Sequence, residues 1–475
     1  MSSSFLKNTG KLLAGNSIGQ LIGIIAIPII TRLYSVEAYG EFSSLLAISL
    51  ILATLSTLSL HLAILIPKSE EEAIKVFKFS LSLTYVFCLL ISAVLYFFNE
   101  DVVSLLNIKS TPLIVYSIPL LVLLQSVYVT VTYMGVRVKV FGKVSASKVV
   151  EGISDRGIAI LSGFSGFAFV GNLILARVTS SALAILYLLP TLKRYQGQGK
   201  TSISNGFIVS KYKRYLQYNT PSMLLINSML QLPVVIIAAY FSSASAGLFA
   251  IANRLVNIPV TALGSAISKT FMQKIAEDKA NDDIEKIKQN TDVFFTVLFA
   301  FLLIPFSVLS VVADSLFIIV LGDKWADAGI LASFLSYFAM STLLVQAFGG
   351  LFDVMNKQQT RLIFHIGNFF VRIGALLLCV YLGYDLTKTV LIYAIASIFM
   401  NVIAMGLLLR CVQQIQSLLS ALITNVIPLI LFHVLTAIVS SSFDNILLRY
   451  SLISVLAIVW FFIIGGLGKI RGFKK

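Results

Sequence analysis

The chain has 475 residues, of which 58% are hydrophobic and only 12% are charged, and its formal net charge is +15. Soluble domains carry about 25% charged residues, so this composition excludes a soluble globular protein and indicates a polytopic membrane protein. A basic excess in such a chain is expected from lysine and arginine in cytoplasmic loops, and it does not by itself indicate nucleic acid as a partner.

The apolar runs are long enough to predict membrane spans along the whole chain. A helix needs about 20 mostly apolar residues to cross the hydrocarbon core. This length predicts an all-α fold with about fourteen spans, at residues 12–34, 42–66, 79–98, 113–134, 146–164, 170–192, 219–241, 248–270, 291–313, 329–352, 363–382, 389–410, 420–440 and 449–467. Polar residues lower the hydropathy of 146–164 and 170–192.

The segment GNSIGQLIGIIAIPIITRLYSVEAYGEF at residues 15–42 has a counterpart later in the chain. The segment YFSSASAGLFA begins at Tyr240, so that Gly40 and Gly247 correspond at an offset of 207 positions. Each glycine lies where one apolar run ends and the next begins, which predicts a tight turn that admits positive φ. The repeat indicates two copies of one membrane unit.

The domain organisation follows from the repeat and from one long polar interval. We expect an N-terminal six-helix bundle at 1–195, a basic cytoplasmic linker at 196–218 and a second six-helix bundle at 219–411. An extra helix pair and a basic cytoplasmic tail then occupy 412–475. The segment 271–290 alternates acids with lysines, which predicts a short amphipathic helix on the inner surface.

Lysine and arginine placement predicts the orientation. With the N-terminus inside, the predicted inner loops hold most basic residues, including clusters at 68–78, 137–148, 193–214, 274–288 and 469–475. The predicted outer loops are mostly acidic. The positive-inside rule therefore predicts an even number of spans with both termini cytoplasmic.

Six basic residues fall within the predicted spans, where insertion scales put an arginine at a helix centre at about 2.5–3.5 kcal/mol unfavourable. They are Arg32, Arg156, Arg177, Arg254, Lys269 and Arg372. Arg32 and Lys269 lie near span ends, where a long side chain can reach the interface and have a purely structural role. A structural alternative for Arg156 is a local pair with Asp155 or Glu151. Because acids are scarce in the spans, the cationic excess predicts an anionic substrate.

Other functional signals are weak. His61, His365 and His433 are scattered without ligand spacing, so we expect no metal site and treat them as core histidines. The sequence has no phosphate-binding glycine loop and no Ser/His/Asp constellation. We therefore expect a protein that is not an enzyme and that uses no cofactor.

Three segments resemble a known family: KNTGKLLAGNSIGQLIGIIAIPIITRLYSVEAYGEF at the N-terminus, LHLAILIPKSEEEA after the second span, and SAGLFAIANRLVNIPVTALGSAISKTFMQKIAE in the second half. They resemble the bacterial polysaccharide exporters, the Wzx-type O-antigen and capsule repeat-unit flippases. That superfamily also contains lipid II flippases and multidrug antiporters. The resemblance extends over nearly the whole chain and does not specify the sugar.

The resemblance implies two pseudo-symmetric six-helix bundles in a V that move undecaprenyl-diphosphate-linked oligosaccharide from the cytoplasmic to the outer leaflet of the bacterial inner membrane. It implies that cationic residues engage the diphosphate, for which the matching candidates are Arg254, Arg372, Arg156, Arg177 and Arg32. Membrane lipids, a polysaccharide polymerase and a chain-length regulator are the further partners that it implies.

Two alternatives remain open from the sequence. A multidrug or cation antiporter of the same superfamily should show acids in its spans, whereas these spans are rich in arginine. A membrane-embedded polysaccharide polymerase generally needs a large outer loop, and the longest outer connections here are short.

Overall fold

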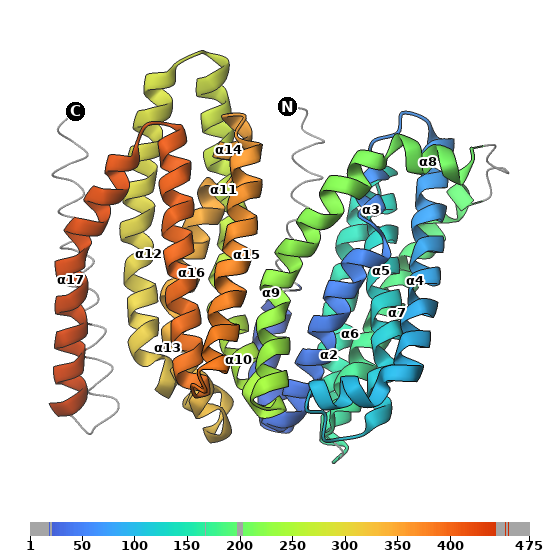
Figure 1. The fold of residues 1–475 in the computed structure, drawn as a ribbon, viewed down its shortest axis with the longest axis horizontal. Coiled ribbons are helices and arrows are strands. Elements are labelled where there is room, and N and C mark those ends of the chain that lie inside the picture. The colour runs from blue at the N-terminus through green and yellow to red at the C-terminus, as the bar shows by residue number, and fades with distance from the viewer. Residues whose placement is uncertain are drawn as a thin grey trace. The chain divides into compact units, whose positions relative to one another are not determined.

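The computed structural model describes residues 19, 21–166, 168–196, 203–442, 452 and 455. These residues form helices joined by short turns and include no strand (Figure 1). The chain is therefore an all-α polytopic membrane protein, as its composition predicts. Residue contacts divide it into two compact units, Met1–Ala250 and Ile251–Lys475.

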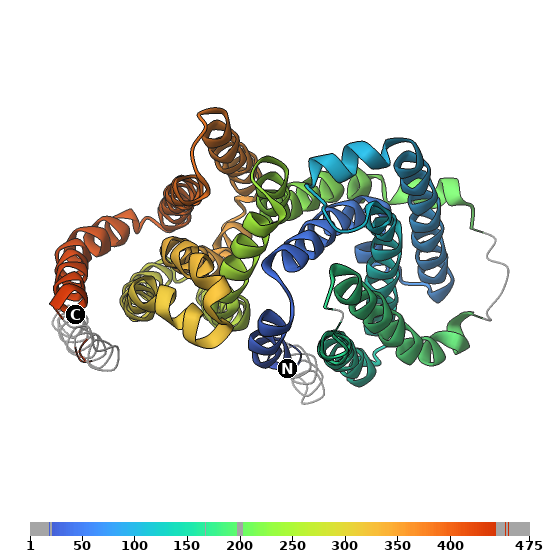
Figure 2. The same ribbon diagram turned by 90° about the horizontal axis from the view of Figure 1, so that it is seen from below.

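Within the described residues, the first continuous element of the first unit is a short apolar helix, Leu21–Leu33. Its further elements are α2 (Val36–Ser56), α3 (Leu60–Ala63), α4 (Glu70–Leu105), η1 (Pro112–Tyr116), α5 (Ser117–Arg137), α6 (Phe141–Phe164), α7 (Val170–Gln196), α8 (Asn205–Lys211), η2 (Tyr215–Asn219) and α9 (Thr220–Tyr240). In this unit α7 packs on both α5 and α6, while α2 packs on α5 and α9. Figure 2 shows α6 and α7 side by side.

The division between the units falls inside α10 (Ser243–Val256). The second unit continues with α11 (Ile258–Ala280), α12 (Ile284–Leu321), η3 (Asp323–Trp325), α13 (Ala326–Phe348), α14 (Leu351–Val354), α15 (Gln358–Tyr381), α16 (Leu386–Cys411) and α17 (Ile415–Ser442). Helix α13 is at its centre because α11, α12 and α16 all pack against it. In the most apolar stretch of α13, 61% of the residues are buried, against 12% in that of α17, so α17 lies at the edge of the second unit.

Eleven helices among the described residues are long and apolar enough to cross a membrane. They match eleven of the fourteen predicted spans in order. Of the other three, α6 carries too many charges to qualify, and the first predicted span is described only as Leu21–Leu33. The last predicted span, 449–467, lies outside the described residues except for residues 452 and 455.

Polar side chains fix where several helices begin. The side chains of Ser35, Ser69, Ser204, Asp283 and Asp385 each accept a hydrogen bond from a backbone N–H three residues later. These bonds satisfy N–H groups that have no partner within the helix. A Ser or Asp residue therefore marks the N-terminal end of α2, α4, α8, α12 and α16 in the sequence.

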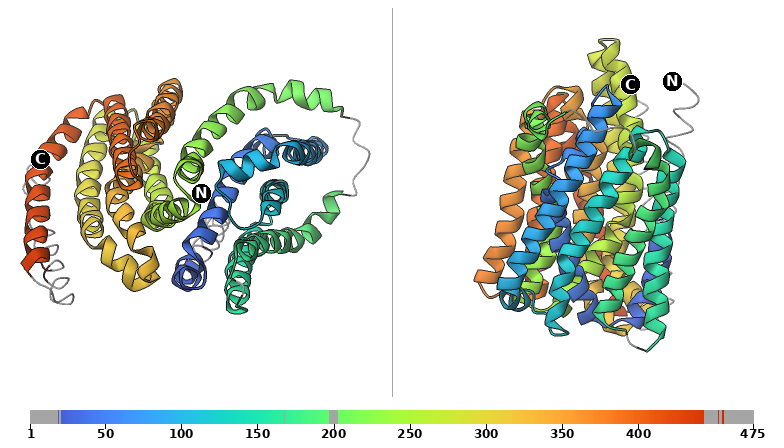
Figure 3. Two further views of the ribbon diagram at one scale, coloured as in Figure 1. Left: turned by 60° about the horizontal axis from the view of Figure 1, so that its bottom comes forward. Right: turned by 90° about the vertical axis from the view of Figure 1, so that its right-hand side faces the viewer.

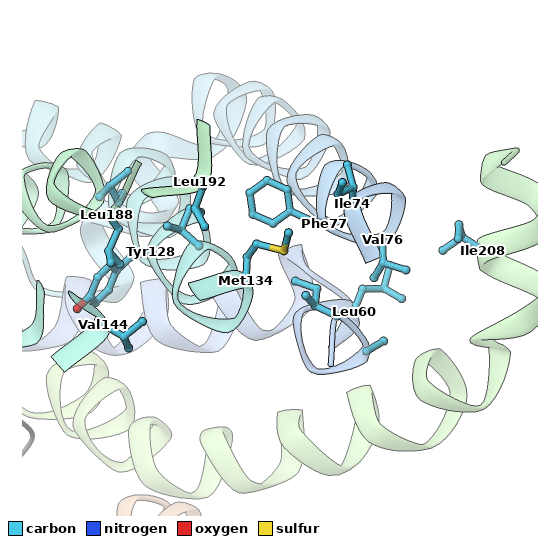
Figure 4. Close-up of a cluster of buried hydrophobic side chains, with 14 of the residues drawn as sticks. Leu60, Ile74, Val76, Phe77, Tyr128, Met134, Val144, Leu188, Leu192 and Ile208 are labelled. Carbon is cyan, nitrogen blue, oxygen red and sulfur yellow. The ribbon is translucent and has the colours of Figure 1, made fainter. Parts of the chain in front are cut away.

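The described part of the predicted linker, residues 203–218, packs against helices of the first unit. Ile208 of α8 is fully buried in a hydrophobic cluster with residues of α3, α4, α5, α6 and α7 (Figure 4). Tyr212 donates to Glu72 at 2.8 Å, and Lys211 forms an ion pair with the same carboxylate at 2.6 Å. Burial and the hydrogen bond to Glu72 raise the pKa of Tyr212. Glu72 therefore anchors the linker helix.

The prediction that Gly40 and Gly247 form turns with positive φ is wrong. Both lie in the second turn of a helix, α2 and α10 respectively, and the glycines with positive φ in the described residues are Gly166, Gly322 and Gly383. Glycine is required at Gly40 and Gly247 for a different reason. A Cβ on Gly40 would lie 1.7 Å from the carbonyl oxygen of Ser243, and a Cβ on Gly247 would lie 2.4 Å from that of Val36. The two helices therefore cross in backbone contact.

The predicted amphipathic helix at 271–290 is also absent. Helix α11 continues to Ala280, a turn follows, and α12 starts at Ile284, so the segment forms the end of a helical hairpin. The hairpin extends beyond the ends of α15 and α16 (Figures 1 and 3). Pairs such as Lys274 with Asp278 and Lys286 with Asp283 explain the alternating charges, because they neutralise one another along the hairpin.

Candidate functional site

Charged side chains from α6 and α7 form a cluster inside the first unit. Arg156 pairs with Asp155 through Nη1 and Oδ2 at 2.7 Å, and Arg177 pairs with Glu151 through Nη1 and Oε1 at 3.0 Å. The second amino group of Arg177 donates to Gln125 of α5 at 2.7 Å. The four charged side chains are 15–19% exposed, so they are largely buried and still accessible.

The spacing on α6 explains why its charges gather. Lys148, Glu151 and Asp155 follow one another at intervals of three and four residues, which places them on one helix face. Lys148 interacts electrostatically with Glu151. With Arg156 and Arg177, three cations meet two carboxylates, so the cluster has a formal charge of +1.

Glycines bring the first helix close to this cluster. A Cβ on Gly23 would lie 3.3 Å from Nη2 of Arg156, and a Cβ on Gly152 of α6 would lie 3.4 Å from the Cα of Gly19. Small residues let helix backbones approach closely inside a membrane. The helix Leu21–Leu33 therefore forms one wall beside the Arg156 guanidinium.

The remaining predicted basic residues lie elsewhere. Arg32 is exposed at the end of the helix Leu21–Leu33, and Arg254 is exposed in the last turn of α10. Lys269 is exposed on α11. The structure thus brings Arg156 and Arg177 together with two carboxylates, and it places Arg254 in the second unit.

Arg372 has different surroundings in the second unit. Its side chain is only 7% exposed and donates to the hydroxyl of Tyr393 on α16. The guanidinium carbon lies 4.7 Å from the ring centre of Phe338 and 5.2 Å from that of Tyr393. The ion pairs between described residues do not include Arg372.

The sequence interpretation missed the uncharged partners of these arginines. Gln125 lies 52 residues before Arg177, and Tyr393 lies 21 residues after Arg372. A polar residue within an apolar span is a signal that could have singled out Gln125, but nothing local pairs it with Arg177.

These groups can bind an anion, and a metal site is not indicated. Guanidinium groups can grip phosphate oxygens with two parallel hydrogen bonds. Within the described residues, no group of three or more His, Cys, Asp or Glu side chains could hold a metal ion.

Comparisons with known proteins agree on the class of protein. The model of a family described as "Polysaccharide biosynthesis protein" matches residues 29–330. The succinoglycan biosynthesis transport protein ExoT of Rhizobium meliloti (strain 1021) is 25% identical over 310 residues. That match covers 64% of this chain and 60% of the relative's length.

Solved structures share the fold at low sequence identity. The lipid II flippase MurJ in an inward closed conformation has a TM-score of 0.71 and 13% identity, covering 96% of this chain and 98% of that one. An inward-facing multidrug resistance MATE family transporter of the MOP superfamily has a TM-score of 0.53 and 14% identity, covering 84% and 96%. These likenesses concern the fold alone.

Proposed function

The chain belongs to the polysaccharide biosynthesis protein family, and from this premise we propose that it is a flippase for lipid-linked oligosaccharide. The substrate is an oligosaccharide repeat unit on undecaprenyl diphosphate, moved from the cytoplasmic to the outer leaflet of the bacterial inner membrane by alternating access. Both termini are cytoplasmic, and the glycan serves O-antigen, capsule or exopolysaccharide synthesis. The transport protein named for succinoglycan supports the last of these.

One observation carries the proposal, namely the cationic cluster around Arg156 and Arg177. A cluster with three cations and two carboxylates keeps a positive charge that an anion can neutralise. Its arginines remain 18% exposed, so a ligand can reach them. The diphosphate is the anionic group common to all isoprenyl-diphosphate-linked glycans, and the isoprenyl chain carries no charge.

The carboxylates have a defined part in this scheme. Asp155 and Glu151 hold the two guanidinium groups in place, and their pairing offsets the cost of burying these charges. A bound diphosphate takes over part of this pairing. The carboxylates therefore compete with the substrate, while Gln125 keeps the direction of the Arg177 side chain in both states.

The exposed arginines Arg32 and Arg254 complete the proposed diphosphate-binding set. Each lies near a helix end and is exposed, so the lipid-linked anion can reach each of them. Arg372 differs from these residues because its side chain is 7% exposed and enclosed by aromatic rings.

The rival function is a cation antiporter of the same fold. Variants of Glu151 and Asp155 distinguish it from a flippase, because the two functions predict opposite effects. If the substrate is a cation, Glu151 and Asp155 bind it, and their amide variants lose transport. If the substrate is a diphosphate, the same variants remove its competitors. We therefore expect Glu151→Gln to bind an isoprenyl diphosphate more tightly than the parent protein does, and Arg177→Ala to bind it more weakly.

The experiment uses the full chain reconstituted in liposomes with a fluorescent isoprenyl-diphosphate oligosaccharide. Arg156→Ala and Arg177→Ala should reduce flipping by at least about tenfold, the effect of losing a hydrogen bond to a charged group. Lysine at either position should restore part of the rate. Arg361→Ala is the matched control, since Arg361 makes an equally short pair with Asp353 at 2.7 Å on an exposed surface. Normal flipping by well-inserted alanine variants would show that these arginines are structural.

A further inference from the structure

The second unit encloses a positive charge that no described carboxylate balances. Arg372 is 7% exposed, donates to the hydroxyl of Tyr393, and lies over the faces of Phe338 and Tyr393. Aromatic faces and a hydroxyl stabilise a guanidinium without neutralising it. An isolated charge in a low-dielectric interior is costly unless a partner of opposite sign accompanies it.

Buried polar atoms without a hydrogen-bond partner lie on α15 and α16 within one helix turn of Arg372 and Tyr393. Nε of Arg372 is one of them, and Oδ1 of Asn368 and Oγ of Ser397 are two others. Asn368 is 6% exposed and Ser397 is fully buried. Buried polar groups are nearly always paired with protein, ordered solvent or a ligand, so three such atoms on adjacent helix turns are candidates to bind one group in common.

The helix geometry places these atoms together. Helices α15 and α16 are antiparallel neighbours joined by a short turn at Gly383, and Arg372 meets Tyr393 across their contact. Asn368 lies one turn from Arg372 and Ser397 lies one turn from Tyr393, both on the side away from the connecting turn. Asn368 and Ser397 therefore lie at a similar height along the two helices, about one turn from the contact of Arg372 with Tyr393.

We propose that Arg372, Asn368 and Ser397 hold a small inorganic anion of halide size inside the second unit. Nε–H of Arg372 and the hydroxyl of Ser397 donate to it directly. The amide of Asn368 donates after a half-turn about its last side-chain bond, which exchanges its oxygen and nitrogen. This site is separate from the proposed diphosphate site.

Two other occupants fit less well. Water could satisfy the three polar atoms, but it would leave the charge of Arg372 without a counterion. A diphosphate that carries sugars and a lipid chain would have to part α13, α15 and α16 to reach a side chain that is 7% exposed. A monatomic anion needs only the space between two helix turns.

The test measures the unfolding temperature of the purified full chain as chloride or bromide replaces gluconate at constant ionic strength, together with binding of radioactive chloride. We expect a saturable rise in unfolding temperature and saturable chloride binding. Arg372→Leu should lose both. Arg361→Leu, on the exposed part of the same helix, should keep both because its ion pair is at the surface.

A second variant covers the case in which Arg372→Leu does not fold. Asn368→Asp supplies a carboxylate one turn from the guanidinium, so it should fold, be stable without halide and lose chloride binding. The proposal is wrong if the parent protein shows no halide dependence or if Asn368→Asp keeps it. It is also wrong if an isoprenyl diphosphate, and not chloride, stabilises the protein through Arg372. Flipping defects of Arg156 and Arg177 variants would stand in either case, so failure here leaves the proposed function intact.

Discussion

The contact between Gly40 and Gly247 predicts that alanine at either position destabilises the protein. A Cβ on Gly40 would lie 1.7 Å from the Ser243 carbonyl oxygen, 2.6 Å from its carbon and 2.9 Å from the Gly247 nitrogen. All three atoms belong to backbone, so no side-chain rotation can relieve the overlap. The helices must separate by more than about 1 Å to restore ordinary contact distances.

The expected loss of stability has two contributions, the steric overlap at the crossing and the weakening of a nearby hydrogen bond. Extra methyl groups in a packed interior cost about 1–3 kcal/mol. Separation also weakens the bond from the Ser243 hydroxyl to the Asn107 carbonyl, which is 2.5 Å long and worth about 1 kcal/mol. We expect each alanine variant to lose about 2–4 kcal/mol of stability.

Alanine at an unobstructed helical glycine is the control, and it should raise the stability of the protein. Alanine is favoured over glycine inside a helix by about 0.5–1 kcal/mol when nothing obstructs its Cβ. Gly157 on α6 and Gly374 on α15 have no atom within 4 Å of such a Cβ. Thermal unfolding of the purified protein should therefore show Gly157→Ala and Gly374→Ala stabilised and Gly40→Ala and Gly247→Ala destabilised. Stabilisation by Gly40→Ala would refute the backbone contact between α2 and α10.

Three further predictions concern the first unit and the driving force. Glu41 is 3% exposed and accepts from the backbone of Lys109 and Ser110 and from the Ser110 hydroxyl, so Glu41→Leu should cost about 1–3 kcal/mol in thermal unfolding and Glu41→Gln less. Tyr212→Phe removes the 2.8 Å bond to Glu72, so proteases should cleave the linker faster while the rest of the protein stays resistant. A potassium-diffusion potential that makes the substrate-loading side negative should speed flipping, because each charge that crosses the whole field gains about 2.3 kcal/mol per 100 mV. Equal rates at zero and imposed potential would show that the diphosphate crosses with its charge compensated.

The sequence predicted the helices well because a span needs only a long apolar run, which is a local property. Eleven of the predicted spans correspond to helices that can cross a membrane. It also offered the local pair of Arg156 with Asp155 as a structural alternative, since neighbouring residues on one helix can be read together. The repeat predicted a second bundle at 219–411, whereas residue contacts divide the chain after Ala250. Helix α9 is counted with the first unit because it packs against α2.

The glycine error has a physical cause. Glycine suits both a turn with positive φ and a close helix crossing, and the local sequence is the same in the two cases. The repeat contained the missing information. Val36 and Ser243 differ by the same 207 positions as Gly40 and Gly247, and each glycine contacts the carbonyl of the other helix's first residue. A reciprocal contact between equivalent positions is what a local two-fold relation produces.

The arginines show why residue type and depth alone do not assign a role. Arg156 is the sixteenth residue of the 24-residue α6, and Arg372 is the fifteenth of the 24-residue α15. Arg156 pairs with Asp155 and remains partly exposed. An anion can therefore reach the guanidinium, where it competes with the Asp155 carboxylate. Arg372 has aromatic faces and is enclosed, so only an ion small enough to stay between two helices can balance it. The difference arises from Tyr393 and Phe338, which the chain brings to Arg372 from other helices. The Asn368→Asp variant would remove that difference by giving Arg372 a neighbouring carboxylate.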